Sequence, residues 1–200
     1  MVVYWFGYLL CYIVSLIFCP IRVVGRENLP KNGAYILAAN HQSNFDPEII
    51  GLTHPRLRPL AYLTKDSLFK NRLLGWIIKH LGGFPVKRGT ADIGALKESI
   101  RRIKQGIPLV MFPEGTRKRP EKMQEVHTGI AFLASKTGVP VIPVFIQGSE
   151  RVLPAGAVIP RRHPVTVIFG KPSRYDRTSS YEEIARRIRE EIYALAQTVQ

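Results

Sequence analysis

The sequence predicts a layered α/β domain, a sheet flanked by helices, preceded by an apolar helix at the N-terminus. Short apolar runs typical of buried strands alternate with longer segments in which apolar residues recur at helical spacing, and this alternation favours a sheet covered by helices. The 200 residues, 46% of them hydrophobic, suit one globular core and exclude a disordered or fibrous chain. We expect residues 1–21 to form a membrane-associated helix and residues 22–200 the α/β domain.

The N-terminal segment is apolar and uncharged as far as Arg22. As a helix, residues 2–19 would be about 27 Å long, enough to cross the hydrocarbon core of a bilayer or to lie in its interface. A cleaved signal peptide is disfavoured because no basic residue precedes the run. A core helix of a soluble domain is the alternative. Arg22 and Arg26 follow the run directly, which favours a globular domain on the cytoplasmic side of the cytoplasmic membrane.

Beyond this segment, strand and helix patterns alternate. Apolar runs predict strands at residues 34–39, 59–64, 107–112, 139–146 and 165–169. Periodicity predicts helices at residues 68–81, 92–104 and 126–136. Two further helices are marked by their first residues: Asp46 as N-cap before Pro47, and Ser180 with Glu183 as a capping box.

The chain is strongly basic, with a net charge of +14. This favours partners that carry phosphate, whether anionic lipid, an anionic substrate or nucleic acid. A nucleic-acid-binding module is a remote alternative and we expect no nucleic acid partner, because no recognised motif is present and the basic residues occur in scattered pairs. The two cysteines, Cys11 and Cys19, lie in the apolar run, so neither a disulfide framework nor a metal site is expected.

A histidine and a carboxylate stand where a predicted strand gives way to a helix, in the stretch NHQSNFD over residues 40–46. Open α/β sheets place their sites at such junctions. His41 can accept a proton near neutral pH, and Asp46 on its other ring nitrogen would fix the tautomer and stabilise the imidazolium. On a regular helix the two would point about 140° apart. The pair therefore requires a turn over residues 41–45; a plain cap beside a loop histidine is the alternative.

Two further stretches combine glycine with basic residues. FPEGTR, over residues 112–117, leaves a predicted strand; Gly115 permits an unusual backbone angle, and Arg117 can hold a phosphate with paired donors. GGFPVKRG, over residues 82–89, favours a turn that presents Lys87 and Arg88 to an anion. Each stretch alone is equally compatible with a solvated basic loop.

In this order, and together with VPVIPV over residues 139–144, these stretches resemble the four sequence blocks of the glycerolipid acyltransferases, specifically the bacterial-type 1-acyl-sn-glycerol-3-phosphate (lysophosphatidic acid) acyltransferases. The resemblance covers residues 26–170. The chain departs from the family pattern at Pro85, where a bulky apolar residue is usual, and at Lys118, where a small hydroxyl residue often stands.

The resemblance implies the fold of the glycerol-3-phosphate acyltransferases and an acyl transfer to the sn-2 hydroxyl of 1-acyl-sn-glycerol-3-phosphate, giving phosphatidic acid. The acyl donor would be a thioester of coenzyme A or acyl carrier protein, with no bound cofactor. His41 would be the general base and Asp46 its orienting partner. Other acceptors stay open: glycerol-3-phosphate, another lysophospholipid or a lyso-aminolipid. So does a non-catalytic membrane scaffold of the same fold.

The resemblance also places the remaining site residues. Lys65, Arg88 and Arg117 are expected to bind the acceptor phosphate. A supporting turn is expected from Glu114, Gly115 and Thr116. The expected partners are the membrane lipid substrate, an anionic bilayer surface and acyl carrier protein if it is the donor.

Overall fold

The structure is a computed structural model of the 200-residue chain. It describes residues 9, 12, 13, 15, 17–54, 59–87, 92–114, 128–154, 157 and 159–199.

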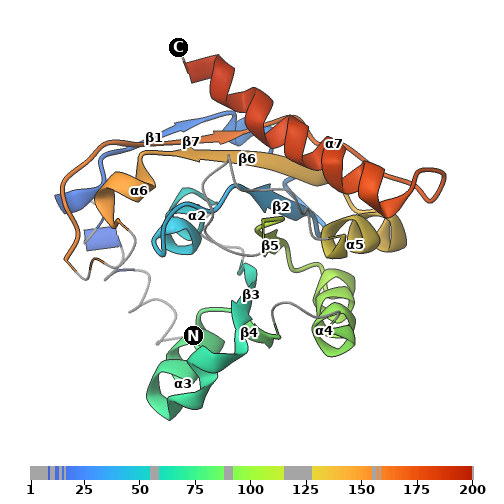
Figure 1. The fold of residues 1–200 in the computed structure, drawn as a ribbon, viewed down its shortest axis with the longest axis horizontal. Coiled ribbons are helices and arrows are strands. Elements are labelled where there is room, and N and C mark those ends of the chain that lie inside the picture. Colours follow the sequence, from blue (N-terminus) through green and yellow to red (C-terminus); the bar gives the residue numbers. More distant parts are fainter. Residues whose placement is uncertain are drawn as a thin grey trace.

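The described part of the chain contains one seven-stranded sheet, ordered β1-β7-β6-β2-β5-β3-β4 (Figure 1). Its strands are β1 (Ile21–Val24), β2 (Ile36–Ala39), β3 (Ala61–Lys65), β4 (Gly83–Val86), β5 (Leu109–Met111), β6 (Val141–Gln147) and β7 (Val165–Phe169). β6 and β7 pair antiparallel, and every other neighbouring pair is parallel. The predicted α/β sheet is therefore confirmed, as a mixed sheet.

Helices cover both faces of this sheet. They are α2 (Asp46–Thr53), α3 (Arg72–His80), α4 (Ile93–Lys104), α5 (Gly129–Thr137), α6 (Ser149–Val152) and α7 (Tyr181–Ala194), with the 3-10 turns η1 (Arg26–Asn28), η2 (Asp66–Lys70) and η4 (Leu195–Val199). One core cluster joins α4, α5 and α7 to the sheet, and a second joins α2 and α6 to its other face. Figure 1 shows α2 to the left of β2 and β5, α4 and α5 to their right, and α6 by the left end of β6.

The carboxyl ends of three neighbouring strands lie side by side, and we call this end of the sheet, as distinct from its two edge strands, the carboxyl edge. Leu37 of β2 is opposite Val110 of β5, which is opposite Tyr62 of β3, and all three strands run in the same direction. The segments that follow these strands, residues 40–45, residues 112–114 and η2, therefore leave the sheet along the same edge. This is where open α/β sheets place their sites.

The prediction of a turn over residues 82–89 is wrong in part. The turn occupies Leu81 and Gly82, after which β4 forms the edge of the sheet and pairs with β3. Pro85 has no N–H to donate, but an edge strand needs partners on one side only, so the proline is tolerated there. Lys87 follows the strand and is exposed, while Arg88 lies outside the described residues.

The helix expected over residues 68–81 is also shorter than predicted. Its first part is the 3-10 turn η2, and α3 begins at Arg72. The side chain of Asn71 accepts a hydrogen bond from the backbone N–H of Leu74 at 3.0 Å and so caps α3 at its first turn. The start of the helix expected at residue 126 lies outside the described residues, and α5 begins at Gly129.

Most of the predicted N-terminal helix, Cys11 included, lies outside the described residues. Residues 9, 12, 13, 15, 17 and 18 are helical, and Leu9, Tyr12, Ile13 and Ile17 are exposed. In the part of the chain described above, every helix is too short or too polar to span a bilayer. Cys19 is buried against the sheet, and this burial raises the pKa of its thiol to about 11.

Gly82 offers a test of how tightly β3 and β4 are joined. Its φ is 93°, and a Cβ placed there would lie 2.0 Å from the carbonyl oxygen of Leu60. We expect Gly82→Ala to lower the free energy of unfolding by about 3 kcal/mol or more, because the turn has to move. The measurement is urea unfolding followed by circular dichroism.

Gly106→Ala is the matched control for this variant. Gly106 has a φ of 78°, but no atom lies within 4 Å of the added Cβ. The expected loss is therefore only about 1–2 kcal/mol, from the left-handed backbone alone. Equal losses in the two variants would show that the close approach to Leu60 is not what matters at Gly82.

Candidate active site

Asp46 is the buried anchor of the turn that follows β2. Its Oδ2 accepts hydrogen bonds from Nδ1 of His41 at 2.8 Å and from the backbone N–H groups of Gln42 and Ser43 at 2.7 and 2.8 Å. The chain turns before α2 begins, which brings together two side chains that a continuous helix would separate. Asp46 is the first helical residue and not the predicted N-cap; Phe45 takes that position, because the Asp46 carboxylate is engaged by the preceding turn.

His41 is held in one tautomer and one orientation. Since Oδ2 of Asp46 already accepts two backbone N–H bonds, it is an acceptor for His41 as well, and the proton lies on Nδ1. In the neutral imidazole, Nε2 is then the acceptor. The side chain is 8% exposed, and its ring stacks on Phe112, with centroids 4.2 Å apart and 25° between the planes. Nε2 is therefore the atom that can take a proton.

Asn40 fixes the turn to the neighbouring strand. Its side-chain amide donates to the carbonyl of Ile146 at 2.8 Å, and its side-chain oxygen accepts from the N–H of Ile146 at 2.7 Å. Both bonds are buried, and they join the end of β2 to the end of β6. Sequence reasoning gave Asn40 no role. A polar amide directly after a buried strand, where backbone groups need partners, was the available signal.

Glu114 supports the backbone of His41 from the segment after β5. One carboxylate oxygen accepts from the N–H of His41 at 3.3 Å, and the other accepts from the hydroxyl of Tyr193 on α7 at 2.5 Å. Burial raises the pKa of Glu114, and these two hydrogen bonds oppose that rise. The carboxylate thus acts as a brace between α7 and the turn. Sequence reasoning missed Tyr193; Gly115 and Thr116 lie outside the described residues.

Of the three cations expected to hold a phosphate, the structure describes one. Lys65 ends β3 and is exposed, at the same edge of the sheet as His41. Arg88 and Arg117 lie outside the described residues, so their convergence with Lys65 stays a prediction. Among the described residues, no group of three His, Cys, Asp or Glu side chains is placed to hold a metal ion.

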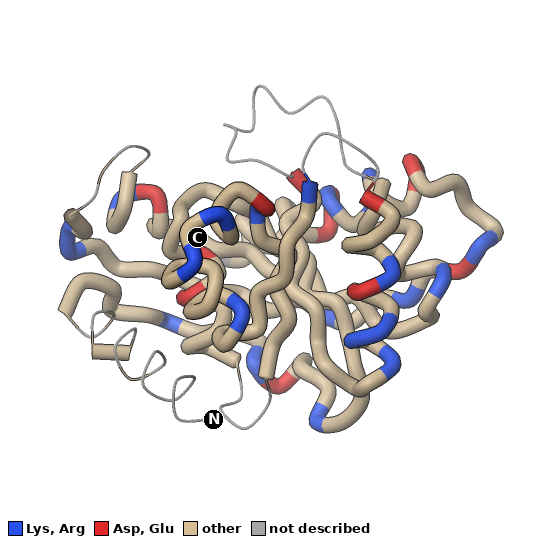
Figure 2. The backbone as a smooth tube through the Cα atoms, turned by 90° about the horizontal axis from the view of Figure 1, so that it is seen from below, with Lys and Arg blue, Asp and Glu red and all other residues tan. Residues whose placement is uncertain are grey.

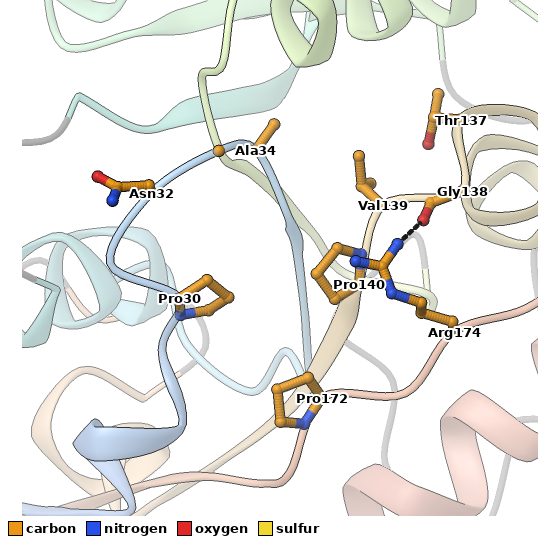
Figure 3. Close-up of a pocket in the computed structure, with 10 residues that line it drawn as sticks. Pro30, Asn32, Ala34, Thr137, Gly138, Val139, Pro140, Pro172 and Arg174 are labelled. Carbon is orange, nitrogen blue, oxygen red and sulfur yellow. Dashed lines mark hydrogen bonds between the residues drawn. The ribbon is translucent and has the colours of Figure 1, made fainter.

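An open pocket of about 640 Å³ lies at the opposite edge of the sheet (Figure 3). Its lining comes from the segments that enter β2 and β6, with Ala34, Val139 and Pro140 among them. Arg174 at its wall already donates to the carbonyl of Gly138. Because β2 and β6 run parallel, this pocket is separated from His41 by the length of the strands.

Glu48 is a second carboxyl group beside Asp46 on α2. Its pKa is raised to about 7, chiefly by burial and also by the negative charge of Asp46, while a hydrogen bond from its own backbone N–H opposes the rise. Its Oε2 has no hydrogen-bond partner among the described residues. Ionisation of Glu48 therefore opposes folding.

The comparisons with known proteins agree on one family. Residues 20–147 match the family model described as Acyltransferase. A chloroplastic 1-acyl-sn-glycerol-3-phosphate acyltransferase from Brassica napus is 30% identical over 155 residues, which are 75% of this chain and 44% of that protein. The 1-acyl-sn-glycerol-3-phosphate acyltransferase of Borreliella burgdorferi is 27% identical over 200 residues, 94% of this chain and 77% of that protein.

A solved structure has the same fold. The crystal structure of the 1-acyl-sn-glycerophosphate (LPA) acyltransferase PlsC from Thermotoga maritima superposes with a TM-score of 0.75 at 30% sequence identity. The match covers 91% of this chain and 73% of that one. The chain spans less than half the length of the relatives from Brassica napus, Arabidopsis thaliana and Chlamydomonas reinhardtii, 44%, 44% and 42% of them.

The raised pKa of Glu48 gives a pH-dependent prediction. Below about pH 4 the carboxyl is protonated in both the folded and the unfolded chain, so Glu48→Gln should have the same stability as the wild type. Between about pH 4 and pH 7 the unfolded chain releases this proton while the folded chain keeps it, so the wild type loses stability relative to the variant, and above about pH 7 the variant should be the more stable by a constant amount. Thermal unfolding at pH 4 and pH 8 measures this; a variant less stable than the wild type at pH 8 would contradict it.

Proposed function

The chain belongs to the acyltransferase family, and on that premise we propose that it transfers a fatty acyl group from an acyl thioester to the sn-2 hydroxyl of 1-acyl-sn-glycerol-3-phosphate. The product would be phosphatidic acid, for phospholipid biosynthesis. The observation that carries the proposal is the 2.8 Å contact between His41 and Asp46 at the carboxyl edge of the sheet. The names of the relatives supply the substrate.

The proposed chemistry is a direct transfer. Nε2 of His41 takes the proton of the acceptor hydroxyl as its oxygen attacks the thioester carbonyl. The tetrahedral oxyanion then collapses and expels the thiolate, which takes the proton back from the imidazolium. Asp46 stabilises the imidazolium between these two steps through its contact with Nδ1. The donor is a thioester of coenzyme A or of acyl carrier protein.

The phosphate of the acceptor would place the hydroxyl at His41. We assign it to Lys65, Arg88 and Arg117; Lys65 stands at the carboxyl end of β3, along the edge that carries His41. A dianionic headgroup held by cations at this edge orients the lipid before reaction, and such orientation can contribute several kcal/mol to the lowering of the barrier.

Both the acceptor and the product are lipids, so we propose that the protein works at the cytoplasmic membrane. Residues 1–21 would anchor it in the bilayer, and residues 22–200 would form the catalytic domain on the cytoplasmic side. Four exposed apolar side chains on the described helical residues before Cys19 are consistent with this anchor. Anionic lipid would also attract the basic domain.

The contact between His41 and Asp46 gives the first prediction from this mechanism. We expect His41→Ala and Asp46→Asn each to lower kcat by about 10²–10⁴, because one removes the base and the other its orienting acceptor. The assay is transfer from a labelled long-chain acyl-CoA to lysophosphatidic acid in detergent micelles. The control is His163→Ala, which should keep full activity. His163 lies beyond α6, and its Nδ1 is hydrogen-bonded to the carbonyl oxygen of Pro164.

The outcomes separate the parts of the proposal. If the wild type and a folded His41→Ala variant form equal amounts of product, His41 is not the general base. A folded wild type that acylates glycerol-3-phosphate but not lysophosphatidic acid would show that the acceptor is wrong.

The brace between α7 and the turn gives a second prediction. Tyr193→Phe removes the hydroxyl that binds Glu114 but keeps the ring that packs against Phe145. We expect kcat to fall by about 3- to 10-fold with KM unchanged, because the backbone of His41 is held less firmly. Tyr181→Phe on the same helix is the control and should leave kcat unchanged, since Tyr181 is exposed and packs on Phe132. An unchanged kcat in Tyr193→Phe would exclude the brace as a determinant of rate.

A further inference from the structure

The segment formed by η2 and α3 exposes large apolar side chains. Leu68 is 41% exposed, Leu73 69%, Leu74 40% and Trp76 48%. These four residues occur within nine positions of the chain. Isolated exposed apolar residues are common on soluble proteins, whereas a contiguous group marks a surface that contacts something else.

The way α3 packs explains why these side chains point outward. Gly75 is its only fully buried residue, and a Cβ there would lie 3.0 Å from the Cα of Phe69. Ile78 lies against Gly83 of β4. Of the nine residues of α3, Gly75 is buried, Ile77 and Ile78 are partly buried, and the other six are exposed.

Apolar and basic side chains occupy different sides of this outer surface. At about 100° per residue, Leu73 and Leu74 lie on one side of α3, and Arg72 and Lys79 lie together on another. Trp76 lies between them, and its ring is 4.3 Å from that of His80. An amphipathic helix with aromatic and basic residues along its border is typical of helices that lie in a membrane interface.

The charge of the segment favours anionic lipid. Lys65, Lys70, Arg72 and Lys79 are exposed, and Asp66 is the only acidic residue in residues 65–80, so the balance is 4 − 1 = +3. Basic residues are spread over the whole width of the molecule (Figure 2), but here they border exposed apolar side chains.

The position of the segment relates it to the site. η2 begins directly after β3, at the edge where His41 follows β2. Figure 1 shows α3 beside β4, at the end of the molecule farthest from α7. A bilayer in contact with this segment would therefore lie next to the edge at which the proposed acceptor reacts.

We propose that η2 and α3 form a second membrane-docking surface, in which Leu68, Leu73, Leu74 and Trp76 enter the headgroup region of an anionic bilayer. The bordering Lys and Arg side chains contact lipid phosphates. This surface uses other residues than the N-terminal segment, and it positions the catalytic edge against the bilayer. The docking proposal rests on the proposed acyl transfer at a membrane. Its test measures binding to vesicles and not turnover, so failure of the docking proposal and failure of the proposed activity can be told apart.

Tryptophan fluorescence tests the proposal directly, because the chain has only two tryptophans, Trp5 and Trp76. A Trp5→Phe variant of the full chain leaves Trp76 as the sole reporter. The probe is a vesicle of equal parts phosphatidylcholine and phosphatidylglycerol, with and without phosphatidylcholine brominated near the carbonyl end of its acyl chains. We expect the emission to shift to shorter wavelength and to be quenched by the brominated lipid. Unshifted and unquenched emission from protein that sediments with the vesicles would overturn the proposal.

Two pairs of variants in the Trp5→Phe chain show which side chains are responsible. Leu73→Ser should reduce the quenching of Trp76 at least 3-fold, because apolar burial is lost. Ile93→Ser on α4, which changes a side chain that is 65% exposed, should not reduce it. Replacement of Arg72 and Lys79 by Gln should raise the amount of vesicle needed for half-maximal quenching about 30-fold, from about 1 kcal/mol for each of the two charges.

The charge-matched control replaces Lys97 and Lys104 on α4 by Gln, which removes the same net charge from exposed positions elsewhere. It should leave the half-maximal vesicle concentration within about 2-fold of the parent. Equal effects of the two double variants, or of Leu73→Ser and Ile93→Ser, would show that total charge and general exposure act instead of this surface, and would overturn the assignment.

Discussion

The candidate site depends on a single buried carboxylate oxygen. Oδ2 of Asp46 accepts from the imidazole of His41 and from two backbone N–H groups of the turn that carries this histidine. The same atom therefore shapes the turn and orients the ring. Because Asp46 is also the first residue of α2, the start of the helix fixes where the carboxylate stands.

Three other parts of the fold secure this arrangement from outside. Asn40 ties the turn to β6, Phe112 covers one face of the imidazole, and Glu114 binds the backbone N–H of His41. α7 adds the hydroxyl of Tyr193 behind Glu114. Strands β2, β5 and β6 and a helix near the C-terminus thus all contribute to the position of one side chain. The imidazole is thus preorganised by contacts from several elements around the one that Asp46 makes.

Much of the fold could be predicted from the sequence because most of its strands are apolar runs, of which β2 and nearly all of β6 are buried on both faces. β2, β3, β5, β6 and β7 all lie within or beside the predicted runs. β1 was missed since Arg22 breaks its apolar pattern, and β4 since Pro85 and two glycines favour a turn. Both are edge strands, where burial is one-sided and the pattern weak. The His41–Asp46 contact could be predicted because it is local.

The supporting residues could not be predicted, because their partners are distant in the sequence. Asn40 meets Ile146 across 106 positions and Glu114 meets Tyr193 across 79, separations at which no spacing rule applies. Arg88 and Arg117 were proposed from motif alone and stay predictions.

The pairing of β1 with β7 has a consequence for biosynthesis. β1 ends at residue 24, and among the described strands it pairs only with β7, which begins at residue 165. At the usual pace of translation of about 5–20 residues per second, roughly 7–30 s pass before β7 has been made. During that time the first strand of the nascent chain waits without its partner. The sheet is complete only once nearly the whole polypeptide has left the ribosome, so co-translational folding would start from β2, β3, β4 and β5, which are made before β6 and β7 and are neighbours in the sheet.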